Sequence, residues 1–312
     1  MSTYLTMTSR IDEYLAMRRQ VGVALGSEGE FLKLFARFAD RAGHHGAFST
    51  QTAVRWATAL RTPNSLTSAY RMLILRRFAV HWRNMEPETE IPVPHMFGRM
   101  SRRLTPHIYT SQEVCDLVAA ADNIGPPGCL RATTSAAIFG LLAATGMRVS
   151  EVINLKRADV QLASGLLHIQ HAKFGKSRWV PIHPSVVEAL AVYTRRRDLD
   201  RSSSGTDSFF VLDHGRAVTY DSISLVFRRL RAQLKWQARG GHPAPRIHDI
   251  RHTFVCSQLE RWARSGSVDN NILALSTYVG HVKVSKTYWY ATGTPELLAI
   301  AAKRFEPTGE CG

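Results

Sequence analysis

Four residues toward the carboxyl end have the types and spacing that chemistry on an anion needs. His248 and Arg251 lie three apart in the run RIHDIRHTF, so on a helix they share one face and can hold a small anion together. His281 follows a glycine, and Tyr290 comes nine residues later. A basic pocket that ends in a phenol is what cutting a phosphodiester without a metal requires.

Taken singly, each of these residues also has an ordinary explanation. His248 and His252 are four apart, as zinc ligands can be, but the segment lacks the glutamate of HExxH, and Arg251 between them would repel a cation. A lone histidine is more often a helix cap or a core residue than a ligand. Tyr288 and Tyr290 could be aromatic packing. Because of Arg251 and the missing glutamate, we expect no metal site at these histidines. We also expect no cofactor.

An upstream corner could supply a second arginine. A strongly apolar helical run stops at Gly146, a residue type that suits the left-handed position at a helix end. Arg148 follows two residues later, so it should project from a tight corner. Glu151 lies about one helical turn farther on, where its carboxylate can orient the guanidinium.

A hairpin could supply a lysine. Two β-like runs, residues 166–170 and 178–182, predict an antiparallel pair whose tip carries Lys173 and Lys176. A lysine at a hairpin tip could swing into a neighbouring site. Lysines are also common at turns, and for this segment alone the ordinary explanation is the stronger one.

The whole chain is basic. Its 312 residues include 40 Lys plus Arg and 25 Asp plus Glu, which gives a net charge of +15, while 45% are hydrophobic. That balance is typical of a folded protein and not of a solvated polycation. The length accommodates two domains, and two basic domains in series favour a shared polyanion such as duplex DNA. Charge alone is equally consistent with a basic protein that binds no nucleic acid.

Cysteine usage and hydropathy bear on the compartment. The four cysteines show no CxxC spacing, which predicts neither a disulfide framework nor a zinc site. No apolar run approaches the roughly 18 residues that a membrane span needs. We therefore expect a cytoplasmic protein with no membrane partner.

The residue pattern divides the chain into two domains. Residues 1–86 show helical spacing of apolar side chains, proline-rich residues 87–106 predict an extended linker, and residues 107–312 form a second domain. Within the second domain, residues 209–212 predict a short strand. Basic residues of the fourth helix and the hairpin are candidate DNA contacts, although a solvated face is the more common meaning of such a pattern. They are Arg71, Arg76, Arg77 and Lys176.

In order and spacing, these positions closely resemble the tyrosine recombinase family, the Xer, Cre and phage-integrase group. The resemblance covers residues 106–304 and, more loosely, the helical part before them. All six active-site positions of the family are matched, by Arg148, Lys173, His248, Arg251, His281 and Tyr290. It implies a mainly α fold with a small β-sheet (α+β), in which a helical core-binding domain and a catalytic domain clamp double-stranded DNA.

The resemblance also implies a role for each matched residue. Tyr290 would attack the scissile phosphate and form a 3′-phosphotyrosyl link with a free 5′-hydroxyl. The link conserves the energy of the broken bond, so resealing needs no ATP. Arg148 and Arg251 would fork onto the non-bridging oxygens, and His281 would add a hydrogen bond to the same phosphoryl group.

Three supporting roles come from the same resemblance. Lys173 would be the general acid for the leaving 5′-oxygen, His248 an assisting proton acceptor, and Glu151 a supporting carboxylate. One departure concerns the nucleophile: Trp289 stands where the family usually has a small or polar residue, which leaves Tyr288 as a minor alternative to the tyrosine two residues later.

For the whole protein, the resemblance implies site-specific recombination through a Holliday junction by a nucleoid-associated homo-tetramer built from two dimers. The enzyme would be an integrase of the transposon, integron or resolvase type. Residues 294–312 resemble the family's carboxy-terminal segment, which docks on a neighbouring protomer; packing on its own domain is the alternative. An accessory recombinase or DNA-bending protein is left open as a partner. The rival functions are a type IB topoisomerase-like enzyme and a catalytically inactive DNA-binding regulator.

Overall fold

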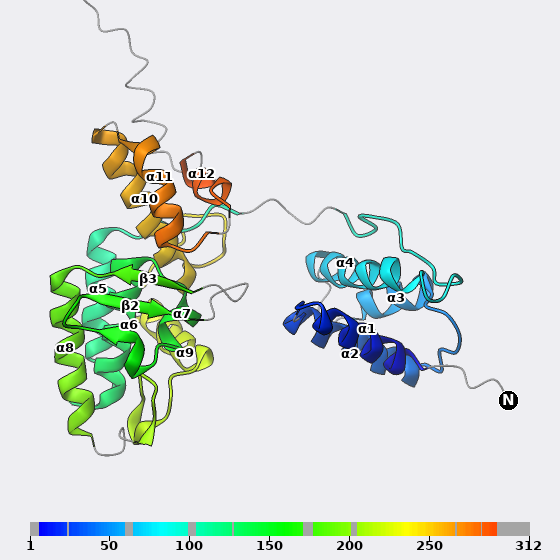
Figure 1. Cartoon of the computed structure of the whole chain (residues 1–312), viewed down its shortest axis with the longest axis horizontal. Coiled ribbons are helices and arrows are strands. Elements are labelled where there is room, and N and C mark those ends of the chain that lie inside the picture. The colour runs from blue at the N-terminus through cyan, green and yellow to red at the C-terminus, as the bar shows by residue number, and fades with distance from the viewer. Residues whose placement is uncertain are drawn as a thin grey trace, which may run out of the picture. The chain divides into compact units, whose positions relative to one another are not determined.

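The computed structural model describes residues 6–23, 25–59, 65–98, 104–126, 128–170, 177–200, 205–265, 267–281 and 283–291. The chain forms two compact units, residues 1–103 and 104–312 (Figure 1). The division falls inside the predicted linker, residues 87–106. The first part of that stretch nevertheless packs on the helical unit, because the backbone N–H of Glu90 donates to the carbonyl of Phe48 and Thr89 is 1% exposed.

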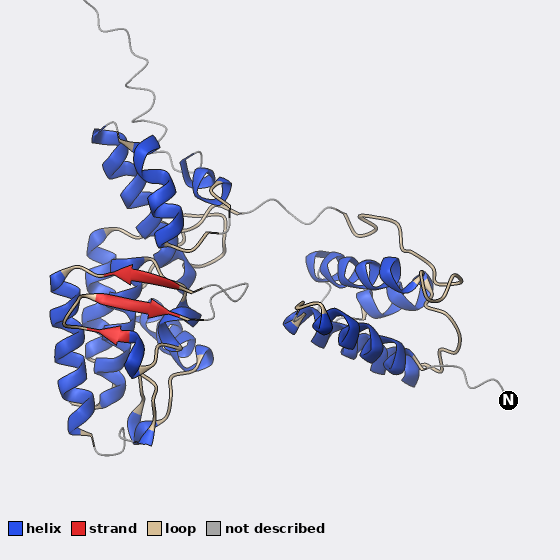
Figure 2. Ribbon diagram, viewed as in Figure 1, coloured by secondary structure: helices blue, strands red, loops and turns tan. Residues whose placement is uncertain are grey.

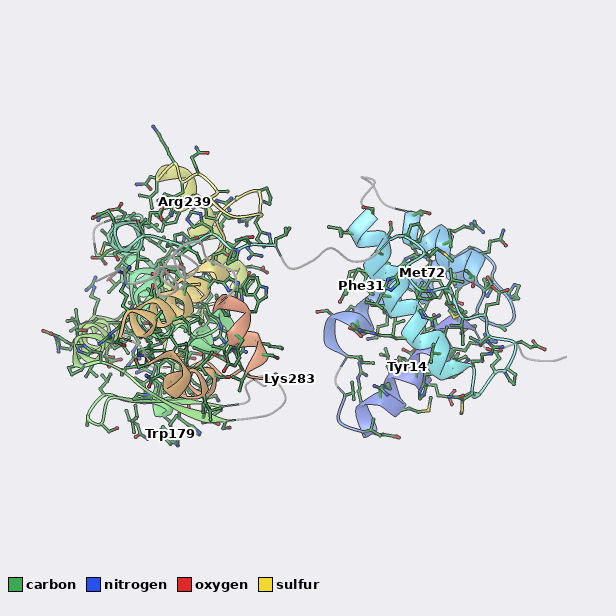
Figure 3. All side chains as sticks on the ribbon, turned by 90° about the horizontal axis from the view of Figure 1, so that it is seen from above. Tyr14, Phe31, Met72, Trp179, Arg239 and Lys283 are labelled. Carbon is green, nitrogen blue, oxygen red and sulfur yellow. The ribbon has the colours of Figure 1, made fainter. Side chains whose placement is uncertain are left out.

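The first unit is a bundle of helices around an aromatic core. Phe78 is fully buried and contacts the rings of Tyr14, Phe48 and Trp82, with centroid separations of 5.3, 5.8 and 5.7 Å. Edge-on and stacked aromatic pairs of this kind add to the free energy gained by burying the rings. Figure 3 labels Tyr14 among the packed side chains. The helices are α1 (Met7–Gln20), α2 (Gly26–Arg41), α3 (Thr50–Thr58) and α4 (Ser65–Trp82).

The second unit is also mainly helical and carries one small antiparallel sheet in the order β1-β2-β3 (Figure 2). The predicted fold class, mainly α with a small β-sheet, is therefore confirmed. The strands are β1 (Val160–Gln161), β2 (Leu166–Ile169) and β3 (Arg178–Pro181). The helices are α5 (Ser111–Asp122), α6 (Leu130–Thr145), α7 (Val149–Ile153), α8 (Pro184–Leu199), α9 (Tyr220–Gln233), α10 (Ile247–Ser265), α11 (Val268–Tyr278) and α12 (Ser285–Ala291), with single 3-10 turns at Arg157–Asp159 and Asp213–Gly215.

The register of the sheet decides which way each side chain of β3 points. Leu167 pairs with Val180, and both are fully buried. On the other face, Trp179, which is labelled in Figure 3, is 50% exposed. Its ring stacks on that of His168, with centroids 4.4 Å apart. Because side chains alternate along a strand, Arg178 lies on the core face with Val180. The charged side chain of Arg178 therefore points from the sheet toward the interior of the second unit.

The hairpin and the end of α6 form as predicted, whereas one predicted strand does not. The pairing of β2 with β3 confirms the hairpin, and Gly146 ends α6 with a left-handed φ of 60°, as predicted. The strand predicted at residues 209–212 is wrong: within it only Val211 makes an isolated bridge, to Ala217. Its apolar residues are buried by side-chain packing against α8 and not by a sheet, since Phe209 and Phe210 both contact the ring of Tyr193. No residue pattern had predicted the two-residue strand β1.

Two predicted features lie outside the described residues. Residues 171–176, which include Lys173 and Lys176, form one gap, and residues 292–312, which include the predicted docking segment, form another. The roles predicted for them stay predictions.

Candidate active site

The site is built around the carboxyl end of α11. The last carbonyl groups of a helix have no partner within it and carry the negative end of the helix dipole. Here three successive carbonyl oxygens each accept a hydrogen bond from an arginine that belongs to a different part of the unit. The pairs are Arg178 Nε with Tyr278, Arg251 Nη2 with Val279, and Arg148 Nη2 with Gly280, at 2.9, 2.7 and 2.9 Å. The carboxyl end of α11 is thus hydrogen-bonded to β3, to α10 and to the α6–α7 corner.

Gly280 makes this convergence sterically feasible. Its φ is +69°, and a Cβ atom there would lie 2.7 Å from Nη1 of Arg178. Only glycine combines that backbone conformation with room for the guanidinium. The chain then places His281 against α12, where its Nδ1 lies 2.7 Å from Oγ1 of Thr287, a residue with no exposed surface.

Glu151 joins two of the arginines. Its carboxylate accepts from the backbone N–H and Nη1 of Arg148, at 3.0 and 2.6 Å. It also accepts from Nη1 and Nη2 of Arg178, at 3.1 and 2.8 Å. Burial alone would raise the pKa of Glu151, but the hydrogen bonds and charge of Arg178, followed by those of Arg148, lower the pKa to about 2. One carboxylate shared by two guanidinium groups leaves this trio with a net charge of +1, so Arg148 is not neutralised.

Arg251 provides the second cationic group. It is 3% exposed, and its Nη1 donates to the carbonyl of Gly146 at 2.7 Å, which ties α10 to the α6–α7 corner. Burial, and then the charge of Arg148, lower the pKa of Arg251 to about 10, so the side chain stays protonated at neutral pH. Each of these two arginines uses two of its five side-chain N–H groups on partners among the described residues, which leaves three each for an anion.

Tyr290 lies on α12, which packs against α10 and α11. It is 2% exposed, and its hydroxyl oxygen lies 2.7 Å from Nδ1 of His252 on α10. Its ring is parallel to that of His281, with centroids 6.2 Å apart. Tyr288, by contrast, is 49% exposed. The two tyrosines therefore differ in surroundings, and only Tyr290 packs among the site histidines.

His248 occupies the first turn of α10. Its ring lies edge to face with that of His252, at a centroid distance of 4.8 Å. Desolvation by surrounding atoms, and then repulsion by Arg251 and Arg246, lower the pKa of His248 to about 4. Part of the side chain is open to solvent, which screens these effects. At neutral pH the imidazole is uncharged.

The fold thus brings together five of the six residues predicted from the sequence, while Lys173 falls in a gap of the description. Sequence reasoning missed three contributors: Arg178, His252 and Thr287. Arg178 had a usable signal, because on the predicted strand it shares a face with the apolar Val180. For His252 the sequence pattern suggests only a zinc ligand, although its spacing of four from His248 places both on one helix face.

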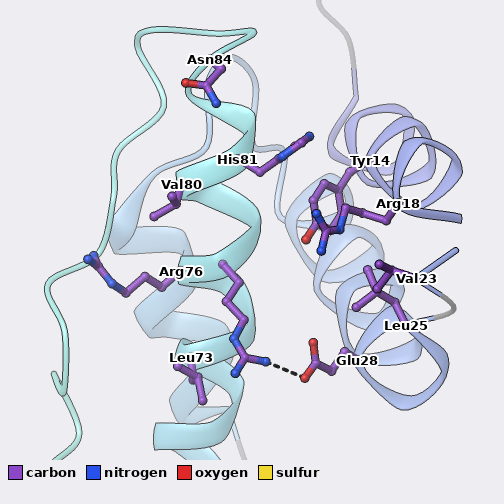
Figure 4. A pocket seen from close by; sticks show the side chains of 11 residues that line it. Tyr14, Arg18, Val23, Leu25, Glu28, Leu73, Arg76, Val80, His81 and Asn84 are labelled. Carbon is purple, nitrogen blue, oxygen red and sulfur yellow. Dashed lines mark hydrogen bonds and ion pairs between the residues drawn. The ribbon is translucent and has the colours of Figure 1, made fainter. Parts of the chain in front are cut away.

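The arginines of α4 have partners within the first unit. Arg71 donates to the carbonyl of Trp56 at 2.9 Å and lies over its ring, and Arg76 donates to the carbonyl of Pro92. Arg77 pairs with Glu28 at 2.7 Å, the dashed contact in Figure 4. These contacts give each of the three arginines a role in holding the first unit together. Their role in DNA binding stays a prediction.

Within the described ranges, no group of three or more His, Cys, Asp or Glu side chains is arranged to hold a metal ion. None of the helices in that part of the chain has the length and apolar character needed to cross a membrane.

The sequence profile of the phage integrase family matches residues 108–296. This chain belongs to the phage integrase family. It is a tyrosine recombinase, and hence an enzyme of the site-specific recombinase class.

Individual relatives cover most of the length of this recombinase. The protein y4rB of Sinorhizobium fredii, named as an integrase/recombinase, is 33% identical over 306 residues, 96% of this chain and 97% of y4rB. Tyrosine recombinase XerD of Lacticaseibacillus casei is 29% identical over 254 residues, 81% of this chain and 78% of that protein. Among solved structures, the Tn1549 transposon integrase in complex with transposon right end DNA has a TM-score of 0.68 at 16% identity and covers 96% of this chain and 99% of that one. That likeness shows the fold.

Proposed function

We propose that this recombinase cuts and rejoins duplex DNA through a 3′-phosphotyrosyl intermediate formed by Tyr290. The observation that carries the proposal is a phenol that lies within hydrogen-bond distance of His252 and stacks on His281, the residue that follows the carbonyl groups holding Arg148 and Arg251. Within the described part of the chain, each of these arginines has three N–H groups left for an anion. In this arrangement the charge that grows on the phosphoryl oxygens in the transition state would meet preorganised donors.

The remaining roles divide between the phosphate and the proton transfers. His281 would donate a hydrogen bond to the phosphoryl group: when Nδ1 accepts from the hydroxyl of Thr287, the proton of the neutral ring is on Nε2. Lys173 would protonate the leaving 5′-oxygen, and His248 would assist as a proton acceptor. Glu151 would hold Arg148 in place, as its two hydrogen bonds to that arginine suggest.

At the level of assembly, we propose that four protomers act as two pairs and exchange strands through a Holliday junction. Double-stranded DNA is the proposed partner. Structures with the same fold include the Tn1549 integrase in complex with transposon right end DNA and XerH bound to difH substrate. These likenesses support an integrase of the transposon or resolvase type. The basic charge of +15 fits a phosphate backbone.

Mapping covalent adducts tests the chemistry. The wild-type chain is expressed, denatured and recovered, and the DNA that remains linked to protein is sequenced, first at the DNA flanking the gene. We expect adducts at one defined sequence with the wild type and with Tyr288→Phe, and none with Tyr290→Phe. Adducts that persist in Tyr290→Phe and vanish in Tyr288→Phe would move the nucleophile to Tyr288.

A plasmid with two copies of the mapped site then separates recombination from its rivals. Recombination excises or inverts the segment between the sites. A topoisomerase-like enzyme would relax the supercoiled plasmid and leave the segment in its original order. A DNA-binding regulator would form no adduct in either experiment.

A further inference from the structure

We propose that His252 is the group that accepts the phenol proton of Tyr290 during cleavage and returns it during resealing. The inference rests on the proposed role of Tyr290 as nucleophile. It assigns a chemical function to a residue that lies outside the six matched positions.

The contact itself is short and enclosed. Nδ1 of His252 and the hydroxyl oxygen of Tyr290 are 2.7 Å apart, and the two residues are 4% and 2% exposed. They come from different helices, α10 and α12, so the fold and not local sequence creates the pair. Trp289 packs beside both rings, with centroids 5.1 Å from Tyr290 and 6.3 Å from His252. A hydrogen bond in such a low-dielectric setting is stronger than the same bond in water.

The chemistry requires an acceptor at this position. A free phenol has a pKa of about 10, so at neutral pH it holds its proton, and attack on phosphorus needs that proton to leave. In the proposed step the O–H bond of Tyr290 breaks and the proton moves to Nδ1 of His252, while the phenol oxygen bonds to phosphorus. The bond from phosphorus to the 5′-oxygen breaks, and that oxygen receives a proton from a separate donor, for which Lys173 is proposed. Resealing runs the same transfers in reverse.

His248 is less suited to this task. Its ring contacts that of His252, but no hydrogen bond joins it to Tyr290 among the described residues. The two histidines of the HDIRH run are therefore not equivalent, although both share one face of α10. The buried His252 meets the nucleophile, and the solvent-exposed His248 is left as an assisting proton acceptor that is not hydrogen-bonded to the phenol in the described part of the chain.

The test separates accepting a hydrogen bond from accepting a proton. His252→Asn keeps an oxygen that can accept from the phenol but has no basic nitrogen, and His252→Gln is a second variant with a longer reach. Adduct formation is timed on a nicked duplex that carries the mapped site, in which the cleaved fragment diffuses away. A general base contributes about 10²- to 10⁴-fold, so we expect both variants to form adduct at least about 100-fold more slowly than the wild type. Thermal melting and DNA binding monitor the fold.

A more acidic nucleophile gives the decisive comparison. Fluorotyrosine at position 290 loses its proton more readily than tyrosine does. In His252→Asn it should therefore raise the rate of adduct formation at least about tenfold, whereas in the wild type it should change that rate much less. A near-wild-type rate in both amide variants would overturn the assignment. So would an equal loss with tyrosine and fluorotyrosine, which indicates a purely structural role. Tyr290→Phe is run in parallel: adduct in that variant overturns the nucleophile itself, a failure distinct from that of His252.

Discussion

Replacing Arg178 by lysine tests whether the shared carboxylate of Glu151 sets the electrostatics of the site. Arg178 donates two hydrogen bonds to Glu151 and one to the carbonyl of Tyr278. A lysine keeps the charge, but one ammonium group cannot span both carboxylate oxygens and the helix end. Hydrogen bonds to charged groups contribute about 1.5–3 kcal/mol each. We therefore expect Arg178→Lys to lower the free energy of unfolding by about 2 kcal/mol and the rate of adduct formation by about tenfold or more.

The pH dependence of stability gives a second readout. The folded pKa of Glu151, about 2, lies below the value of about 4.3 in an unfolded chain. The ionised carboxylate therefore stabilises the fold above pH ~4.3, and this contribution, roughly 3 kcal/mol at most, is lost as the pH falls from there toward 2. Arg178→Gln removes the largest stabilising partner and raises the pKa of Glu151. Acid unfolding should then begin at a higher pH than in the wild type.

Urea unfolding of the full chain at several pH values and adduct formation on nicked DNA measure the two effects. Arg197→Lys is the matched control, because Arg197 on α8 is also buried, donates twice to one carboxylate, that of Asp198, and bonds the carbonyl of Phe209. It should lose stability without a change in adduct rate per folded molecule. If Arg178→Lys behaves like this control, Arg178 is only a structural residue and the electrostatic reasoning is wrong.

Two other substitutions probe how the site is positioned. At Gly146 a Cβ atom would lie 2.4 Å from the ring of Phe254 at a φ of +60°, so Gly146→Ala should cost about 3 kcal/mol of stability and impair cleavage. Gly22→Ala is the control, because Gly22 has a φ of +77° but no atom within 4 Å of an added Cβ. It should lose only the stability that the left-handed backbone costs alanine, about 1–2 kcal/mol in the free energy of unfolding measured in urea, and should keep a normal adduct rate. Thr287→Val removes the hydroxyl bonded to Nδ1 of His281 and should slow adduct formation about three- to tenfold with little change in DNA affinity; an unchanged rate would mean that Thr287 does not hold the ring.

The sequence by itself determined the parts of this recombinase that depend on local chemistry. The apolar run that stops at Gly146 determined where α6 ends, because only a left-handed residue could follow it there. The spacing of three between His248 and Arg251 determined that both start α10 on one face. Residue types at fixed separations were also enough for the resemblance to the family, which the sequence profile confirms.

Only the tertiary structure decided which residues meet. The fold pairs Arg178 with Glu151, His252 with Tyr290 and Thr287 with His281, which lie 27, 38 and 6 positions apart in the chain. No periodicity in the sequence encodes such pairs. The convergence of three arginines on the end of α11 arises because buried carbonyl groups must find donors, and the fold brings the donors from the sheet, α10 and the α6–α7 corner. The sequence therefore specified the reacting groups, and packing decided how their charges and protons are shared.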